Sequence, residues 1–398
     1  MKTPEYDILI VGGGLAGMSL ALGLAGSSLR VALVDAVDYE TRLSAGAGDR
    51  ALALAKGSML LLERLGVWPA VLPYATPIRH IHVSDRGHSG KVRLHAARER
   101  VDALGWVVTA RDLEREALAA MERTAVERIV PARVGGLKAG MDGVCVTLSR
   151  DGRSESLTAR LLVGADGGDS SVRRLLDIGQ SEHDYGQVAV TTVVKPAVDP
   201  QGTAFERFTP EGPLALLPVE DGKAALVWTR HPEQAERLMG LPEPQFIREL
   251  QAAFGHWLGE LSLAAPRRKF PLKLIRAQQL AAERAVLIGN AAHQLHPVAG
   301  QGYNLGLRDA ARLAELLLET LVCGGDVGDR GMLQTFAAER GREHDRVIGM
   351  TDFLATWFAT ENPAAVLLRN AGLALVERLP FARRALARQA MGLNWRGV

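Results

Sequence analysis

The sequence predicts an α/β protein in three parts: a parallel sheet flanked by helices, an inserted antiparallel sheet and a C-terminal helical region. Apolar runs that end in glycine, typical of buried parallel strands, occur in YDILIVGGG, LLVGADG and AVLIGNAAH. Between 185 and 274 the runs VAVTTVV, AFERF, LALLPV and AALVWT alternate with Pro/Gly turns, as antiparallel strands do. From Leu307 onward the pattern is mostly helical.

The third glycine-ended strand follows the antiparallel segment, so the first domain must be discontinuous. We expect this domain to comprise 1–75, 100–180 and 275–340. A second domain then comprises 76–99 and 181–274, and the helical region 341–398. Within these parts the patterns predict helices over 15–25, 51–66, 111–123 and 243–255, and short strands over 31–36, 76–108 and 128–162.

Composition excludes several classes of protein. A hydrophobic content of 47% and a charged content of 23% are those of a folded protein. The net charge of +2 gives no indication of nucleic-acid binding. Cys145 and Cys323 are far apart and form no CxxC, which excludes a disulfide framework and fits a reducing, cytoplasmic location. The uncharged run 8–29 follows Glu5 and Asp7 and is rich in glycine, so a buried strand, turn and helix fit it better than a membrane span.

Gly12, Gly14 and Gly17 form a G-x-G-x-x-G turn between a strand and a helix, which is typical of a Rossmann-like domain. The first glycine permits the tight turn, the second admits a pyrophosphate, and the third lets helix and sheet pack closely. Asp35 ends the next strand, where an acid can bind an adenosine ribose. The alternative is a tight turn without a ligand.

Two later segments extend this motif. One contains Asp166-Gly167 with Ser170 and Arg173; the other contains Gly289-Asn290, Pro297 and 300–302, which reads GQG. Together with the first turn they resemble the class A flavoprotein monooxygenases, in which the three motifs bind FAD. The resemblance covers essentially the whole chain. It implies a Rossmann-like FAD-binding domain with an inserted antiparallel-sheet substrate domain.

Further motifs resemble the ubiquinone-biosynthesis hydroxylases. They are Asp49-Arg50, Leu104-Gly105, Arg111-Asp112-Leu113, Asp184-Tyr185-Gly186, Phe205-Glu206-Arg207-Phe208, Gly212-Pro213-Leu214, Leu217-Pro218 and Thr351-Asp352. Most of that family has Asp where this chain has Asn290. The departure is similar to the branch that hydroxylates 2-polyprenyl-6-methoxyphenol, whose motif reads GNAA. The alternative for Asn290 is a neutral replacement at a position that needs only a hydrogen-bond partner.

The resemblance implies which residues meet the cofactor. Asp166 and Asn290 would hold the ribityl and phosphate part, and the Val134 backbone would contact the adenine. For Arg50 and Arg111, expected at the phosphates or ribityl chain, the alternative is a structural or solvated salt bridge. The full set is Gly12, Gly14, Gly17, Asp35, Arg50, Arg111, Val134, Asp166, Asn290, Pro297, Gly300, Gln301, Gly302, Tyr303 and Asn304.

The implied activity is hydroxylation of a phenol through a flavin C4a-hydroperoxide, with O₂ as co-substrate and NAD(P)H or another reductant as electron donor. For 2-polyprenyl-6-methoxyphenol the product would be 2-polyprenyl-6-methoxy-1,4-benzoquinol. The segment 135–140 has the wrong glycine spacing for a second dinucleotide site. Tyr185, His296 and Tyr303 are candidates for the general base, with core packing as the alternative for each. His293 and His296 are three residues apart, but no third ligand is nearby, so we expect no metal.

The C-terminal stretch 378–398 carries five arginines and no acid among large apolar residues. Such a basic amphipathic segment can lie on an anionic membrane or dock on a partner, such as another quinone-biosynthesis protein. A prenylated phenol partitions into membranes, so contact with the inner membrane would serve this substrate. The alternative is a helix that packs on the body with a solvated basic face. Two other functions remain open: hydroxylation at another ring position or of another aromatic, and a non-catalytic structural subunit of a quinone-biosynthesis assembly.

Overall fold

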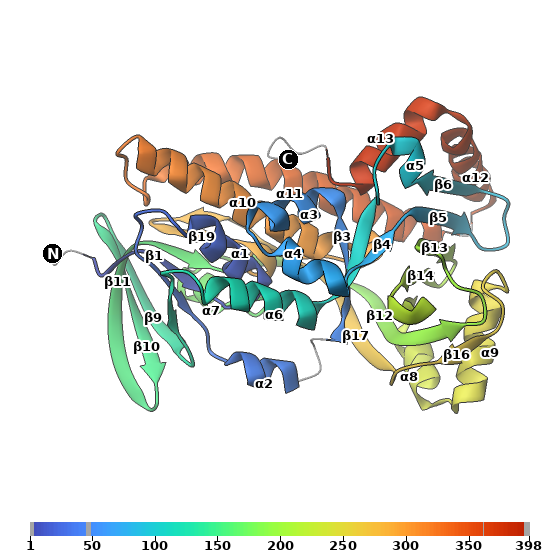
Figure 1. Ribbon diagram of the computed structural model, residues 1–398, viewed down its shortest axis with the longest axis horizontal. Helices are drawn as coiled ribbons and strands as arrows, with labels where there is room; N and C mark the ends of the chain where they lie inside the picture. The colour runs from blue at the N-terminus through green and yellow to red at the C-terminus, as the bar shows by residue number, and fades with distance from the viewer. Residues whose placement is uncertain (1–3, 45–48, 361, 394–398) are drawn as a thin grey trace.

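The computed structural model describes residues 4–44, 49–360 and 362–393, which form three sheets and a layer of long helices (Figure 1). The first sheet has the strand order β18-β19-β11-β1-β2-β8, and β10 and β9 continue from β11 as an antiparallel hairpin. The pairings from β19 to β8 are all parallel. The strands are β1 (Tyr6–Val11), β2 (Val31–Val34), β8 (Glu127–Ile129), β9 (Arg133–Gly140), β10 (Gly143–Arg150), β11 (Arg153–Gly164), β18 (Ala281–Ala282) and β19 (Ala285–Leu287).

Both faces of this sheet are buried, which explains the unbroken apolar run of β1. Ile8 and Ile10 face a core built with α1 (Leu15–Leu24), α6 (Ala110–Met121) and α10 (Gln301–Val322). Leu9 and Val11 face the opposite core, which β10 closes with Val146. The parallel sheet and its β-α-β unit are therefore confirmed.

The second sheet has the order β20-β17-β12-β15-β14-β13-β5-β6, with β16 beside β12. It is antiparallel except where β13 pairs with β5. One face packs on α8 (Pro232–Gly240) and α9 (Glu243–Phe254) through a core that includes Trp228, Phe246 and Phe254. The strands are β5 (His80–Asp85), β6 (Lys91–His95), β12 (Gln180–Pro196), β13 (Thr203–Thr209), β14 (Gly212–Pro218), β15 (Ala224–Arg230), β16 (Leu261–Leu263), β17 (Arg268–Ala277) and β20 (His293–Gln294).

A small third sheet, β3-β7-β4, joins the two larger ones. It corrects one sequence prediction: residues 51–66 do not form a single helix. Strand β3 (Ala51–Ala55) comes first and α3 (Lys56–Arg64) follows. Because alternate residues Leu52 and Leu54 are buried, pairing with β7 (Gly105–Thr109) overrides the helix propensity of alanine. Strand β4 (Thr76–Ile78) also pairs with β7, whereas the expected boundary assigned it to the second domain. Three short helices complete this region: α4 (Trp68–Val71), η2 (Leu72–Tyr74) and α5 (Ala96–Glu99).

The C-terminal helices span the molecule. In Figure 1, α10 and α11 (Arg330–Ala359) run across the top of the view, and α12 (Pro363–Arg378) and α13 (Pro380–Ala390) lie at the right end. Helix α11 contacts β18 of the first sheet and β13 and β14 of the second. None of the helices in the described ranges combines the length and apolar character that a membrane crossing requires.

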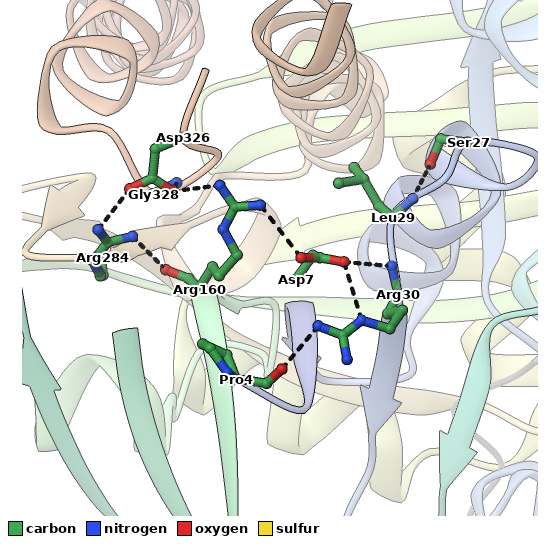
Figure 2. Close-up of polar contacts among 9 residues, drawn as sticks. All are labelled: Pro4, Asp7, Ser27, Leu29, Arg30, Arg160, Arg284, Asp326 and Gly328. Carbon is green, nitrogen blue, oxygen red and sulfur yellow. Dashed lines mark hydrogen bonds and ion pairs between the residues drawn. The ribbon is translucent and has the colours of Figure 1, made fainter. Parts of the chain in front are cut away.

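A chain of ion pairs ties the loop after α10 to the start of β1 (Figure 2). Asp326 pairs with Arg284 at 2.6 Å and with Arg160 at 3.0 Å. Arg160 and Arg30 also pair with Asp7, the second residue of β1. The network lies at the end of β1 opposite the glycine turn. It leaves the carboxyl ends of the strands, where open α/β sheets bind ligands, to the loops described below.

Candidate active site

The glycine turn after β1 is shaped by close contacts that only glycine allows. Gly12 has φ +113°, and a Cβ there would lie 2.3 Å from the carbonyl oxygen of Ala165. A Cβ at Gly17 would lie 1.9 Å from the carbonyl oxygen of Gly12. Gly14 differs, because among the described residues the only atom within 4 Å of its Cβ position is Nη1 of Arg42, at 3.8 Å. The turn is thus closed toward the protein and open on its outer side at Gly14.

The open side faces the N-terminus of α1. Its N-cap is Gly14, which provides no side-chain hydrogen bond, and the first turn contains no acidic residue. The free N–H groups and the helix dipole therefore favour an anion at this point. The turn fits the pyrophosphate of a dinucleotide in shape and charge.

Asp35 lies beside the turn, where the ribose-binding acid is expected. Its carboxylate accepts hydrogen bonds from the backbone N–H of Gly13 at 2.5 Å and of Val37 at 3.0 Å. It also pairs with Arg42 on α2 (Tyr39–Ser44) at 2.5 Å. Arg42 also donates to the carbonyl oxygen of Gly13. This arginine at the mouth of the turn is absent from the sequence prediction, because no motif marks its position.

Arg50 and Arg111 lie on the same side but in different environments. Arg111, in the first turn of α6, pairs with Asp49 at 2.8 Å. Arg50 is exposed. Burial raises the pKa of Glu114 on α6, while Arg42 and Arg50 act to lower it. Two arginines thus lie near the half-buried carboxyl of Glu114. Arg111 forms an ion pair with Asp49, which agrees with the alternative of a structural salt bridge for this residue.

The two later motifs are held together by one arginine. Arg173, on α7 (Ser171–Leu175), donates to the carbonyl oxygens of Ala291 at 2.8 Å and Gly168 at 2.7 Å. Asp166 accepts from Ser170 and from two backbone N–H groups at the start of α7. The Asp166 side chain therefore caps α7 in this structure, and its position beside the turn is fixed by that helix.

Asn290 lies on the exposed side of the short helix η4 (Gly289–Ala291). Gly289 beneath it has φ +59°, and a Cβ there would lie 2.8 Å from the Cβ of Ala16 on α1. Gly306 on α10 packs against Gly289 from the other side. Two helices thus fix the backbone, and Asn290 forms no hydrogen bond with other residues in the described ranges. Its amide is available to a ligand.

The segment from Pro297 to Asn304 turns into α10 through η5 (Val298–Gly300). Gly300 has φ +61°, and its Cβ position lies 2.9 Å from the Cβ of Ala53 on β3. No atom lies within 4 Å of the Cβ position of Gly302, so space is open there. Gln301 is buried. The side chain of Asn304 is fully bonded: it accepts from Ala55 and Ser58 and donates to the carbonyls of Ala53 and Gly300. Asn304 therefore fastens the loop to β3.

Val134, the expected adenine contact, is half-buried on β9 opposite Leu148, next to a bulge of β9 at Gly135. Two residues earlier, the N–H of Ala132 donates to the carbonyl oxygen of Asp35 at 2.7 Å. The backbone leading to Val134 is thus joined to the end of β2, on the side of the turn.

Tyr185 and His296 come together, as candidates from distant parts of the chain. Their rings are 5.0 Å apart, edge to face. Tyr185 lies at a bulge of β12, where Gly186 has φ +60°. Burial, together with Asp352 on α11, raises the pKa of Tyr185 to about 12. Asp352 is part of the Thr351-Asp352 motif, but sequence analysis assigned it no role.

His296 is 1% exposed and electrically neutral. Its Nδ1 accepts from the N–H of Val298 at 3.2 Å, so Nε2 carries the proton and donates to Oε1 of Gln187 at 3.2 Å. Burial lowers the pKa of His296 to about 4, although Asp352 acts to raise it. Tyr303 lies elsewhere: it packs against the main core, where burial raises its pKa beside Ser19.

Two further potential metal ligands lie near His293, so the prediction that no third ligand is nearby is wrong. His293, Asp309 and His344 are buried together, with their potential ligand atoms within 4.8 Å of one another, and His296 is not part of the group. Each histidine Nε2 lies 2.9 Å from the Asp309 carboxylate, and Arg340 donates to the same group at 2.6 Å. These partners and the neighbouring guanidinium explain the group as a hydrogen-bonded joint between α10, α11 and β20.

The geometry can now be compared with known proteins. Residues 5–351 match a family described as the FAD binding domain. The chain belongs to this family. It is a FAD-dependent aromatic monooxygenase, and its relatives include ubiquinone hydroxylases. Ubiquinone hydroxylase UbiL of Rhodospirillum rubrum is 38% identical over 97% of this chain and 89% of its own length. The 3-demethoxyubiquinol 3-hydroxylase of Escherichia coli is 31% identical over 99% of this chain and 100% of its own length.

Solved structures share the fold of this flavoprotein. The p-nitrophenol 4-monooxygenase PnpA from Pseudomonas putida DLL-E4 superposes with a TM-score of 0.81 at 20% identity, over 100% of both chains. The probable FAD-dependent monooxygenase pqsL from Pseudomonas aeruginosa gives a TM-score of 0.76 at 24% identity, over 92% of this chain and 99% of its own. The predicted α/β fold with FAD as cofactor is confirmed.

Proposed function

We propose that this flavoprotein hydroxylates the ring of a polyprenyl phenol in ubiquinone biosynthesis, converting 2-polyprenyl-6-methoxyphenol to 2-polyprenyl-6-methoxy-1,4-benzoquinol. The supporting observation is the open cradle at Gly14, which lies at the same ends of the strands as the exposed Asn290. Relatives named as ubiquinone hydroxylases support the substrate class. The substitution of Asn for Asp at 290 supports the choice of ring position.

When bound, FAD supplies the activated oxygen that hydroxylation of a phenol requires. The N-terminus of α1 binds the phosphates, Asp35 the ribose and Asn290 the ribityl chain. The turn from Pro297 to Gly302 orients the ring of the cofactor. Neutral His296 donates a hydrogen bond to the Oε1 atom of Gln187. It therefore holds in place the bulge of β12 that contains Tyr185, and it does not act as an acid.

We also propose that O₂ is the co-substrate and that NAD(P)H or another reductant delivers electrons directly to the flavin. The segment 135–140 lies in β9, an antiparallel strand paired with β10, and so forms no second strand-to-helix phosphate turn. A donor without a domain of its own must reach the flavin from solvent. Stopped-flow reduction with NADH, NADPH and a ferredoxin would identify the donor.

One experiment tests the substrate. The chain is expressed in bacterial strains that are each blocked at one ring hydroxylation of ubiquinone synthesis, and quinone intermediates are quantified. We expect 2-polyprenyl-6-methoxyphenol to disappear and ubiquinone to return only in the strain blocked at that step. Rescue of another strain would move the reaction to another ring position. Rescue by a flavin-free Gly14→Val variant would instead support a structural subunit.

We further infer that the C-terminal helices rest on an anionic membrane. Helix α12 turns Arg369 and Asn370 inward, where both bond to Asp85. Three of its four leucines are exposed: Leu367 at 71%, Leu368 at 63% and Leu375 at 57%. The next helix, α13, adds Arg383, Arg384 and Arg388, and interfacial helices combine such basic and apolar residues.

Only part of the segment 378–398, which the sequence predicts to contact the membrane, is free to do so. Ala387 and Met391 are buried against β6, and the carbonyl of Met391 accepts from Gly57 at 2.8 Å. Residues 394–398 lie outside the described ranges. The inner side of α13 therefore matches the packed-helix alternative, and α12 carries most of the proposed contact.

Substitution tests this contact better than truncation, because part of the tail is packed. Leu367→Ser with Leu368→Ser should lower co-sedimentation with phosphatidylglycerol vesicles several-fold, and added salt should weaken binding of the unmodified protein. Leu72→Ser is the control, since Leu72 is a 50% exposed leucine outside α12. Equal sedimentation of all three proteins would contradict the contact, and salt-sensitive capture of another quinone-biosynthesis protein instead would make α12 a protein interface.

A further inference from the structure

Glu206 is an acidic side chain for which neither the fold nor the cofactor cradle accounts. It lies in the middle of β13, in the motif Phe205-Glu206-Arg207-Phe208. Phe205 packs toward α9, with its ring 5.4 Å from that of Phe254. Because side chains alternate along a strand, Glu206 must face the opposite side of the sheet.

The neighbours of Glu206 on that side define its location. Phe208 stacks on Phe358 of α11, with centroids 3.8 Å apart. Ala204 packs with Ile78 and Val107 of the third sheet. Each is two residues from Glu206, about 7 Å along a strand. Glu206 thus lies between α11 and the small sheet that connects the two domains.

The strands beside Glu206 offer it nothing polar. It is opposite Ala215 on β14 and Val83 on β5. Glu206 forms no hydrogen bond or ion pair with any residue within 4–44, 49–360 or 362–393. Burying a carboxylate that has no partner costs free energy, and burial raises the pKa of Glu206 to about 7. The residue nevertheless keeps some accessible surface.

The side of the sheet that carries Glu206 adjoins the turn expected to hold the flavin ring. Leu217, on the same side of β14, packs in one cluster with Ala204 and with Ala51 of β3. Two residues along β3, Ala53 closes on Gly300. A short run of contacts therefore leads from the wall that carries Glu206 to the loop before α10.

We propose that Glu206 is a catalytic residue that accepts the hydrogen bond, and then the proton, of the phenolic hydroxyl of the substrate. The inference rests on the proposed function. A single acceptor among apolar neighbours fixes the position of the hydroxyl, and so it selects which ring carbon faces the flavin.

The proton balance is simple. As oxygen is transferred to the ring, the phenolic O–H bond breaks, its proton moves to Glu206 and its electron pair forms the carbonyl of a hydroxycyclohexadienone. The ring C–H then loses its proton, and the protonated Glu206 returns one to the carbonyl oxygen, which gives the quinol. Glu206 is regenerated and the ring proton passes to water. The oxidant is O₂, and the two electrons of the reductant convert its second oxygen atom to water.

The test compares the FAD-loaded protein with its Glu206→Gln and Glu206→Leu variants, and with Glu233→Gln, an exposed control on α8. The probes are 2-geranyl-6-methoxyphenol and its methyl ether, which lacks the hydroxyl. Binding is followed by the flavin absorbance and turnover by product analysis across pH. The thermal unfolding midpoint of each protein is recorded.

We expect the wild type to prefer the phenol to the ether, and to lose about tenfold in phenol affinity in the Leu variant, with Gln between them. Wild-type kcat/KM should rise with pH through about 7, as this carboxyl ionises, and the Gln variant should lack that rise. The unfolding midpoint should not fall, since no partner is lost, and Glu233→Gln should match the wild type.

Two failures are distinguishable. If the wild type hydroxylates the phenol and both Glu206 variants keep its affinity and pH profile, this inference alone is overturned. If the wild type neither binds nor hydroxylates the phenol, the proposed function fails and the inference with it. A lower unfolding midpoint with matching flavin loss in both variants would make Glu206 a structural residue and overturn its role.

Discussion

At the scale of single residues, the three glycines of the first turn have separable tasks. Gly12 and Gly17 meet protein backbone at distances that exclude a side chain, whereas Gly14 meets open space. These contacts agree with the separate tasks that the G-x-G-x-x-G motif predicts for the three glycines. Gly12 and Gly17 are needed for folding, and Gly14 leaves room for a ligand.

Gly14→Val should therefore fold and fail to hold FAD. Its φ of −77° suits any residue, and its Cβ would be 3.8 Å from the nearest atom. We expect FAD affinity to fall at least tenfold, about 1.4 kcal/mol, with the circular dichroism spectrum unchanged. Gly349→Val, on an exposed face of α11 with no atom near its Cβ position, is the control. Full flavin occupancy in Gly14→Val would refute this role of the turn.

Asn290 makes a second test at this scale. Its backbone is held between two helices, so replacing the exposed side chain should leave the fold intact. Asn290→Asp should retain FAD, because the acceptor for the ribityl hydroxyl remains. Asn290→Leu should lose about 1 kcal/mol of FAD affinity, as one hydrogen bond is removed. Fluorescence titration of the apoprotein with FAD measures both, and equal affinities for all three proteins would show that Asn290 makes no such bond.

At the scale of elements, buried charge joins the long helices to the sheet segment before the flavin turn. Asp309 of α10 bonds to Arg340 and His344 of α11 and to His293 of β20. The contacts with His344 and Arg340, and the hydrogen bond with His293, hold the pKa of Asp309 well below its usual range, despite burial. Helix α10 begins at Gln301, so this joint fixes the helix that follows the flavin turn.

Asp309→Asn should destabilise the protein by about 3 kcal/mol, because buried Arg340 would lose one of its two counter-charges and keep only Glu343. Asp345→Asn is the control: Asp345 is on α11 and pairs with Arg276, but it is 58% exposed, and such pairs contribute about 0–1 kcal/mol. Urea unfolding measures both. Elemental analysis should find no stoichiometric metal, and zinc at one per chain would instead make these residues a metal site.

At the scale of the whole molecule, stability should depend on pH through buried neutral histidines. His296 titrates at about 4 in the folded protein, against 6.5 for the free side chain. Between these values the unfolded chain binds a proton that the folded chain does not, so stability falls as pH decreases from 6.5 to 4. His82, whose pKa burial also lowers to about 4, acts in the same direction.

We expect His296 to account for about 2 kcal/mol of stability lost between pH 7 and pH 5. Urea unfolding of wild type and His296→Gln at both pH values tests this, since the variant keeps a donor for Gln187 but does not titrate. Between pH 7 and pH 5 the free energy of unfolding of the variant should fall by about 2 kcal/mol less than that of the wild type. A pH dependence identical to that of the wild type would show that protonation of His296 does not lower the free energy of unfolding.

The sequence by itself determined the fold class and the first glycine turn. Strand, glycine turn and helix follow one another locally, so their spacing predicted the phosphate turn and the acid at Asp35, whereas the two later motifs were predicted from the family resemblance. These features depend on contacts within about 30 residues, where backbone sterics and hydrophobic period act directly.

The tertiary structure decided which residues are free and which are already bonded. Asn304 is used to fasten a loop to β3, and Arg111 is paired with Asp49. Arg42 reaches Asp35 from α2, and Glu206 is left alone between α11 and the small sheet. These outcomes arise from pairings between distant strands and helices. A side chain's hydrogen bonds and burial depend on whatever the rest of the chain brings beside it, so no local pattern could have assigned them.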